Sequence, residues 1–90
     1  MPTISQFFGI VIRMYFDDHS PPHFHAIYGD DEAVLAIDTL RVIGGQLPRR
    51  ALSLVLEWAN LHRVELSDNW HRAERHEPLK RVAPLDEQGG

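Results

Sequence analysis

The chain has 90 residues, 43% of them hydrophobic, and carries 9 Lys and Arg against 13 Asp and Glu, which gives a net charge of −4. This length fits one domain with a modest core, the lack of cysteine excludes disulfides and thiolate zinc sites, and the acidic balance disfavours nucleic acid as a partner. No apolar run is long enough to span a membrane and no signal-peptide layout opens the chain, so we expect a cytoplasmic protein without membrane contact.

Alternating apolar residues predict an antiparallel meander in the first half of the chain. The first predicted strand covers residues 10–16, with one face formed by Ile10, Ile12, Met14 and Phe16 and the other by Val11, Arg13 and Tyr15. Further strands are expected over residues 23–28, 33–37 and 40–43. Gly44 and Gly45 are expected to end the last of them.

One long helix is predicted from Pro48 to about Arg75, because apolar residues then recur at helical spacing without an intervening Pro or Gly. If unbroken, it would be about 42 Å long. A kink at Ser67-Asp68 is the alternative, since these residues could cap a second helix. Beyond the helix, residues 79–83 are expected to return as a last short strand.

The predicted fold class is therefore α+β, with an antiparallel sheet of four to five strands packed against one long C-terminal helix, continuous or kinked. We expect a single domain over residues 1–85 and a flexible tail over residues 86–90.

The predicted helix is apolar on two sides, and both sides need a cover. The side expected to face the sheet carries Leu52, Val55, Leu56, Ala59, His62, Leu66, Trp70 and Ala73. The other side carries a stripe of Leu54, Trp58 and Leu61, which either another chain or the C-terminal segment 79–85 would have to cover. We predict that Trp58 packs on another chain, and that the partner-binding residues are Leu54, Trp58, Leu61, Arg49 and Arg50. The two arginines oppose the helix dipole at the start of the helix, which favours a contact role.

Three histidines, His19, His23 and His25, lie within seven residues and predict a site. Alternation on a strand places His23 and His25 on the same face, and His19 stands on the adjoining loop. These three side chains could bind zinc or another divalent transition metal, with an oxygen from Asp17 or Asp18. The alternative is structural: the histidines are exposed strand residues, or hydrogen bonds tie them to the Asp17-Asp18 loop.

A metal-free catalytic site is the other chemical interpretation of the same sheet face. His23 and His25 could transfer protons, Arg13 could neutralise a phosphate, and Tyr15 could stack or donate. This set suits cleavage of an RNA phosphodiester, although the net negative charge argues against binding RNA.

Several segments together carry a resemblance: Pro2-Thr3-Ile4-Ser5, Phe7-Phe8-Gly9-Ile10-Val11-Ile12-Arg13-Met14-Tyr15-Phe16, Pro21-Pro22-His23-Phe24-His25-Ala26, Leu47-Pro48-Arg49-Arg50-Ala51-Leu52 and Trp58-Ala59. Over residues 1–84 the chain resembles a family of small bacterial proteins known as domain of unknown function 4160. The resemblance implies a lone cytosolic domain, often encoded beside another small protein family, in a pair proposed to act as a toxin–antitoxin module.

We therefore expect a partner-binding component of a toxin–antitoxin-type pair, whose partner is a protein encoded nearby or a second copy of the chain. This function requires no cofactor. The alternative is a small metal-binding or RNA-hydrolysing protein that uses the histidine cluster, so whether the protein is an enzyme stays open.

Overall fold

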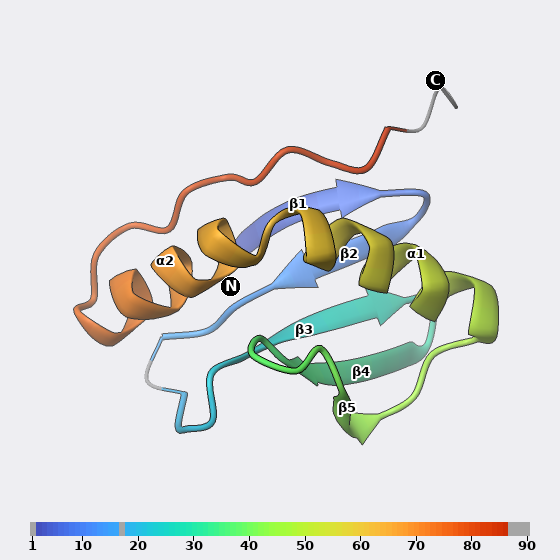
Figure 1. Ribbon diagram of the computed structural model, residues 1–90, viewed down its shortest axis with the longest axis horizontal. Coiled ribbons are helices and arrows are strands. Elements are labelled where there is room, and N and C mark those ends of the chain that lie inside the picture. Colours follow the sequence, from blue (N-terminus) through green and yellow to red (C-terminus); the bar gives the residue numbers. More distant parts are fainter. Residues whose placement is uncertain (1, 17, 87–90) are drawn as a thin grey trace.

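A five-stranded antiparallel sheet forms the first half of the molecule (Figure 1). The computed structural model describes residues 2–16 and 18–86. Neighbouring strands follow the chain order, as the predicted meander requires: β1 (Thr3–Phe7), β2 (Ile10–Arg13), β3 (His23–Tyr28), β4 (Asp31–Ala36) and β5 (Val42–Gly45). The α+β class and the antiparallel sheet are therefore confirmed.

One strand was not predicted, one predicted strand is absent, and the bounds of three others differ. β2 ends at Arg13 and not at residue 16, β4 covers Asp31–Ala36 and not residues 33–37, and β5 covers Val42–Gly45 and not residues 40–43.

The fifth strand is β1, and residues 79–83 form no strand. β1 was not predicted because its register shifts between Thr3 and Ser5, so that the consecutive residues Ile4 and Ser5 are both buried and the strand shows no regular alternation. Residues 79–83 run extended beside β1, where the Val82 N–H donates to the Ile4 carbonyl at 2.8 Å.

Gly44 and Gly45 belong to β5, whereas the prediction had them stop the strand before residue 44. Gly44 and Gly45 pair with Val34 and Ala33 of β4. Gly45 has φ +67°, and a Cβ atom there would lie 2.0 Å from the Glu32 carbonyl oxygen. Only glycine allows the two backbones to approach this closely.

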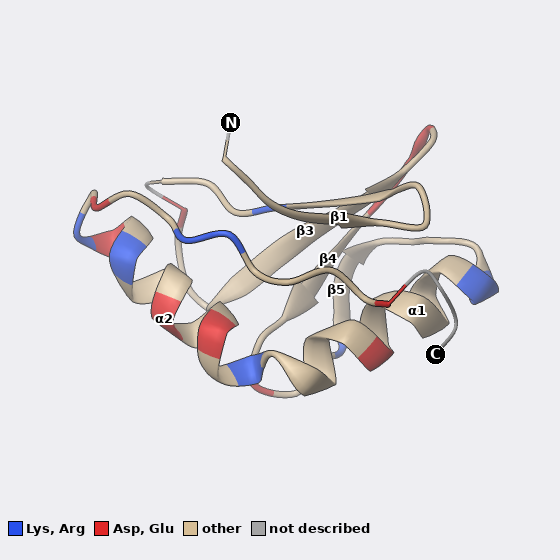
Figure 2. Cartoon of the chain, turned by 90° about the horizontal axis from the view of Figure 1, so that it is seen from above, with Lys and Arg blue, Asp and Glu red and all other residues tan. Residues whose placement is uncertain are grey.

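Two helices, α1 (Arg49–Leu61) and α2 (Arg63–Glu74), replace the single long helix that was predicted. The break lies at His62 (φ −124°, ψ 29°) and not at Ser67-Asp68. An unbroken helix of about 42 Å would exceed the longest dimension of the molecule, which is 35 Å. The break lets both helices cover the same sheet face (Figures 1 and 2). Neither helix of the described residues is long and apolar enough to cross a membrane.

Trp58 is part of the core, so its predicted role as an exposed contact with another chain is wrong. Its side chain is 0% exposed, and its ring centroid lies 5.3 Å from that of Phe7 and 6.0 Å from that of Phe24. The indole Nε1–H donates to the Ala83 carbonyl at 2.8 Å, so the C-terminal segment covers this residue. Trp58 is three residues after the core residue Val55, which puts it on the core side as well as beside Leu54.

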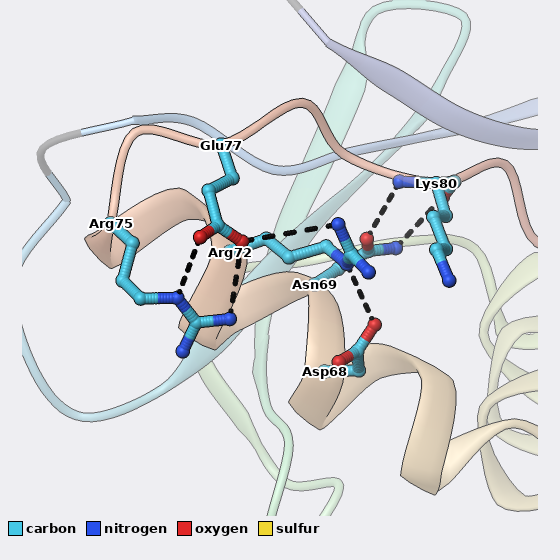
Figure 3. A network of polar contacts seen from close by, with 6 residues as sticks. All are labelled: Asp68, Asn69, Arg72, Arg75, Glu77 and Lys80. Carbon is cyan, nitrogen blue, oxygen red and sulfur yellow. Dashed lines mark hydrogen bonds and ion pairs between the residues drawn. The ribbon is translucent and has the colours of Figure 1, made fainter.

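The C-terminal segment is attached to α2 by a pair of hydrogen bonds (Figure 3). Asn69 Nδ2 donates to the Lys80 carbonyl at 2.9 Å, and the Lys80 N–H donates to Asn69 Oδ1 at 2.8 Å. Val82 and Leu85 are buried farther along the segment. Of the tail expected over residues 86–90, residues 87–90 lie outside the described part.

Candidate functional site

The loop between β2 and β3 passes the C-terminal half of α2 (Figure 1), and His23, at the start of β3, contacts Trp70 of that helix. His23 and His25 stand on β3, and the register places His25 opposite Arg13 of β2. Tyr15 follows β2 and packs edge-on against His25, with ring centroids 4.6 Å apart. Arg13, Tyr15 and His25 are therefore brought together, as predicted. The expectation that His23 shares an open sheet face with them is wrong, because His23 is 7% exposed and packs on Trp70 of α2.

Asp18 joins the two histidines. Its Oδ2 atom lies 2.9 Å from Nε2 of His23 and 3.4 Å from Nε2 of His25. One ligand atom from each of the three residues lies within 4.8 Å of the others. We call Asp18, His23 and His25 the metal group below.

The other nitrogen of each imidazole also faces an oxygen atom. Nδ1 of His23 donates to the Pro21 carbonyl at 2.6 Å, and Nδ1 of His25 lies 2.8 Å from Glu32 Oε2. A carbonyl or carboxylate oxygen that accepts the Nδ1–H keeps the ring orientation fixed and leaves Nε2 as the atom that binds a metal. This is the outer arrangement that histidine ligands have in metal sites.

Aromatic packing holds the two rings in place. His23 is 7% exposed and its ring centroid lies 5.2 Å from that of Trp70 on α2. The His23 and His25 centroids are 5.4 Å apart in an edge-to-face arrangement. His23 thus contacts the helical layer as well as its sheet neighbours.

A cavity of about 290 Å³ opens beside the metal group. It is lined by Tyr15, Asp18, Trp70, Ala73 and Glu74. The cavity therefore gives solvent access to the side of the metal group that faces α2.

The structure separates His19 from the other two histidines. His19 is exposed on the loop, and the group of possible metal ligands contains Asp18 in its place. Asp17, the other oxygen considered, lies outside the described residues. Arg13 has a buried Nε atom without a hydrogen-bond partner in the described part of the chain.

Sequence reasoning missed two residues of the site, Glu32 and Trp70. Glu32 could have been found from the hairpin turn at Gly29, because that turn fixes the register in which Ile27 opposes Glu32 and His25 opposes Val34. All four side chains then share a face. The contact of Trp70 with His23 carries no such signal, since it depends on the break at His62.

The predicted partner-binding residues do not form one surface. Arg49 and Arg50 are exposed at the start of α1, and Leu54 lies with Arg50 in the lining of a separate cavity of about 160 Å³. Leu61, at the other end of α1, is 66% exposed. The burial of Trp58 removes the centre of the predicted patch.

Comparison with known proteins gives one match. A family model described as a domain of unknown function (DUF4160) matches residues 9–71, which include the metal group, β2 to β5 and most of both helices. No curated protein and no solved structure matches the chain.

Proposed function

We propose that this chain, which belongs to the family of the domain of unknown function DUF4160, binds a divalent transition metal ion through Asp18, His23 and His25. Zinc suits this donor set, since imidazole nitrogen and carboxylate oxygen are both among its ordinary ligands. The family carries no assigned activity, so the proposal stands on the geometry of these three side chains.

A single observation carries the proposal: all four ring nitrogens of His23 and His25 face oxygen atoms. A neutral imidazole has one N–H and one lone pair. With Nδ1–H donated to Pro21, a neutral His23 directs its Nε2 lone pair at Asp18 Oδ2, 2.9 Å away. Without an ion, the Nε2 lone pair and the carboxylate oxygen repel each other. A metal ion bound between them would accept electron density from both atoms, so the contact would become favourable.

The rival explanation is a proton in place of the metal. Each histidine would then be an imidazolium that donates from both nitrogens, and Asp18 and Glu32 would balance the two charges. Metal content separates the two explanations directly, because only the metal proposal requires an ion at stoichiometric occupancy.

The donor set also indicates a class of chemistry. Three protein ligands plus a water are typical of catalytic zinc sites, in which the metal lowers the pKa of the water and makes it a nucleophile near neutral pH. Hydrolysis is therefore the reaction class that we propose for the site. Metal-free RNA cleavage has less support, since none of the residues that line the cavity is Lys or Arg.

The test is zinc binding by calorimetry and elemental analysis on protein purified with added zinc. We expect about one zinc per chain, and a loss of at least about tenfold in affinity for each of Asp18→Asn, His23→Ala and His25→Ala. The matched controls are His19→Ala, from the same loop, and His71→Ala, an exposed histidine on α2. Zinc absent from the natural protein, or lost equally in the controls, would refute the proposal.

Binding of a partner protein stays a second candidate function. In place of Trp58, it is supported by two exposed apolar residues at the junction of α1 and α2. Leu61 is 66% and Val64 83% exposed. Apolar side chains exposed to this extent mark contact sites when they cluster. We therefore propose that a protein encoded nearby, as in a toxin–antitoxin pair, would contact this junction.

Co-expression with the neighbouring gene product tests this second function. We expect a complex that survives sizing chromatography, with growth arrest by one member and rescue by the pair. Leu61→Glu and Val64→Glu should disrupt the complex, whereas Val42→Glu, an exposed apolar residue on β5, should not. Free migration of both proteins in the natural pair would exclude this partner.

A further inference from the structure

The lining of the cavity beside the metal group combines aromatic rings with carboxylates. Tyr15 and Trp70 supply the rings, and Asp18 and Glu74 supply the carboxylates. Aromatic faces and carboxylates both attract cations. We infer that this cavity binds a primary ammonium group, and that the substrates of the proposed metal site are amine-bearing compounds; the second part rests on the proposed function.

The positive side chains of α2 do not reach into this cavity. Arg72 Nε donates to Asp68 at 2.9 Å and Arg75 Nε donates to Glu77 at 3.1 Å (Figure 3). Arg72 is thus held by a carboxylate of the same helix, and Arg75, which caps the end of α2, is held by Glu77 beyond it. The cavity keeps its acidic lining.

Glu74 is the carboxylate that is available for an ammonium group. Asp18 already faces both histidines of the metal group. Glu74 has a weaker contact, since its Oε1 atom lies 3.3 Å from Nδ1 of the exposed His71. An ammonium group in the cavity would gain a charge-assisted hydrogen bond from Glu74.

Size and charge both disfavour a phosphodiester. The volume of about 290 Å³ lies just below the usual range for small-molecule sites, roughly 300–1,000 Å³. It suits an ammonium head group with a short carbon chain better than a nucleotide. The lining of the cavity carries two carboxylates, Asp18 and Glu74, and no Lys or Arg that would attract a phosphate.

The experiment is an NMR titration with n-butylammonium chloride and, as the matched anion, sodium butyrate at the same ionic strength. We expect saturable shifts of the Trp70 indole and Ala73 amide signals with n-butylammonium and none with butyrate. Glu74→Gln should weaken binding about three- to tenfold. The control is Glu65→Gln, because Glu65 forms the same i,i+3 contact with a histidine and has a similar exposure, 50% against 51%.

Two further ligands identify the source of the ammonium group. L-alaninamide represents the amino terminus of a peptide and putrescine represents a polyamine, so tighter binding of either than of n-butylammonium supports the inference and assigns the source. Saturable binding of butyrate, no saturable binding of any amine, or equal losses in Glu74→Gln and Glu65→Gln would overturn it.

Each titration is run on zinc-treated and on chelator-treated protein. Amine binding to protein that takes up no zinc would support the cavity and refute the metal proposal. Zinc binding by a protein that binds none of the amines would support the metal proposal and refute the inference about the cavity.

Discussion

Glu32 shows how much the site depends on residues that would not touch the metal. Its Oε2 atom lies 2.8 Å from Nδ1 of His25, at the side of the ring opposite Asp18. A carboxylate in this position fixes the ring and makes Nε2 more basic. Glu32 would therefore position a ligand and not act as one.

We predict that Glu32→Ala lowers zinc affinity about 10–100-fold. Glu32→Gln should retain most of the affinity, because its amide oxygen accepts the same Nδ1–H. Calorimetry at one fixed pH measures both, with the exposed neighbour Asp31→Ala as control. Unchanged affinity in Glu32→Ala would mean that this contact has no part in metal binding.

Trp58 gives a second prediction at this scale. Trp58→Ala should lower the free energy of unfolding by about 3–5 kcal/mol, because it removes a large side chain from a closed core. Urea denaturation measures the loss, and Leu61→Ala, which is largely exposed, should change stability by less than about 0.5 kcal/mol. A Trp58→Ala variant of natural stability would contradict the packing described above.

Single residues could be predicted from the sequence only where a strand fixes them. Alternation correctly placed His25 beside Arg13 because β2 and β3 are regular there. The choice between Asp18 and His19 depends on the conformation of a loop, for which periodicity gives no information. The burial of Trp58 depends on a segment 25 residues later in the chain.

At the scale of elements, the attachment of the C-terminal segment to α2 is the contact most open to test. Asn69 is 1% exposed and makes both hydrogen bonds to the backbone of Lys80. Since the segment also covers Trp58 and pairs with β1, its loss would expose two parts of the core.

We expect Asn69→Ala to lower the free energy of unfolding by about 1–3 kcal/mol, because the Lys80 N–H and carbonyl lose their partner. Hydrogen exchange should rise at the Val82 amide, which pairs with Ile4. Asn60→Ala, an exposed asparagine on α1, serves as the control. Equal exchange at Val82 in both variants would show that other contacts hold the segment.

The helices illustrate what periodicity can predict about elements and what it cannot. Spacing identified the core residues Val55, Ala59, Leu66, Trp70 and Ala73 correctly. It missed the break at His62, since no Pro or Gly marks it in the sequence. It also missed β1, whose irregular register hides the alternation.

At the scale of the whole molecule, the ion pairs near the end of α2 contribute to the dependence of stability on pH. The hydrogen bond from Arg72 lowers the pKa of Asp68 below its ordinary value of 3.8, and that from Arg75 lowers the pKa of Glu77 below 4.5. A carboxylate with a lowered pKa in the folded state stabilises the fold above its ordinary pKa. This stabilisation is lost as the pH falls through the folded value.

We predict that Arg75→Gln lowers the urea midpoint at neutral pH and that the difference from the natural protein shrinks below about pH 4.5. The effect should be small, since both side chains of the Arg75–Glu77 pair are largely exposed to solvent. Denaturation at a series of pH values checks it, with the exposed Arg41→Gln as control. A difference that stays constant down to the lowest pH would contradict the assignment to Glu77.

The cover that residues 79–85 place over Trp58 makes closure of the core depend on a segment that follows both helices. Until the Ala83 carbonyl accepts from the indole and the Val82 N–H pairs with Ile4 of β1, this side of the core lacks its cover. Apolar surface left open in a partly folded chain promotes aggregation. A chain shortened before residue 79 should therefore aggregate more readily than the full chain, which light scattering during refolding would measure.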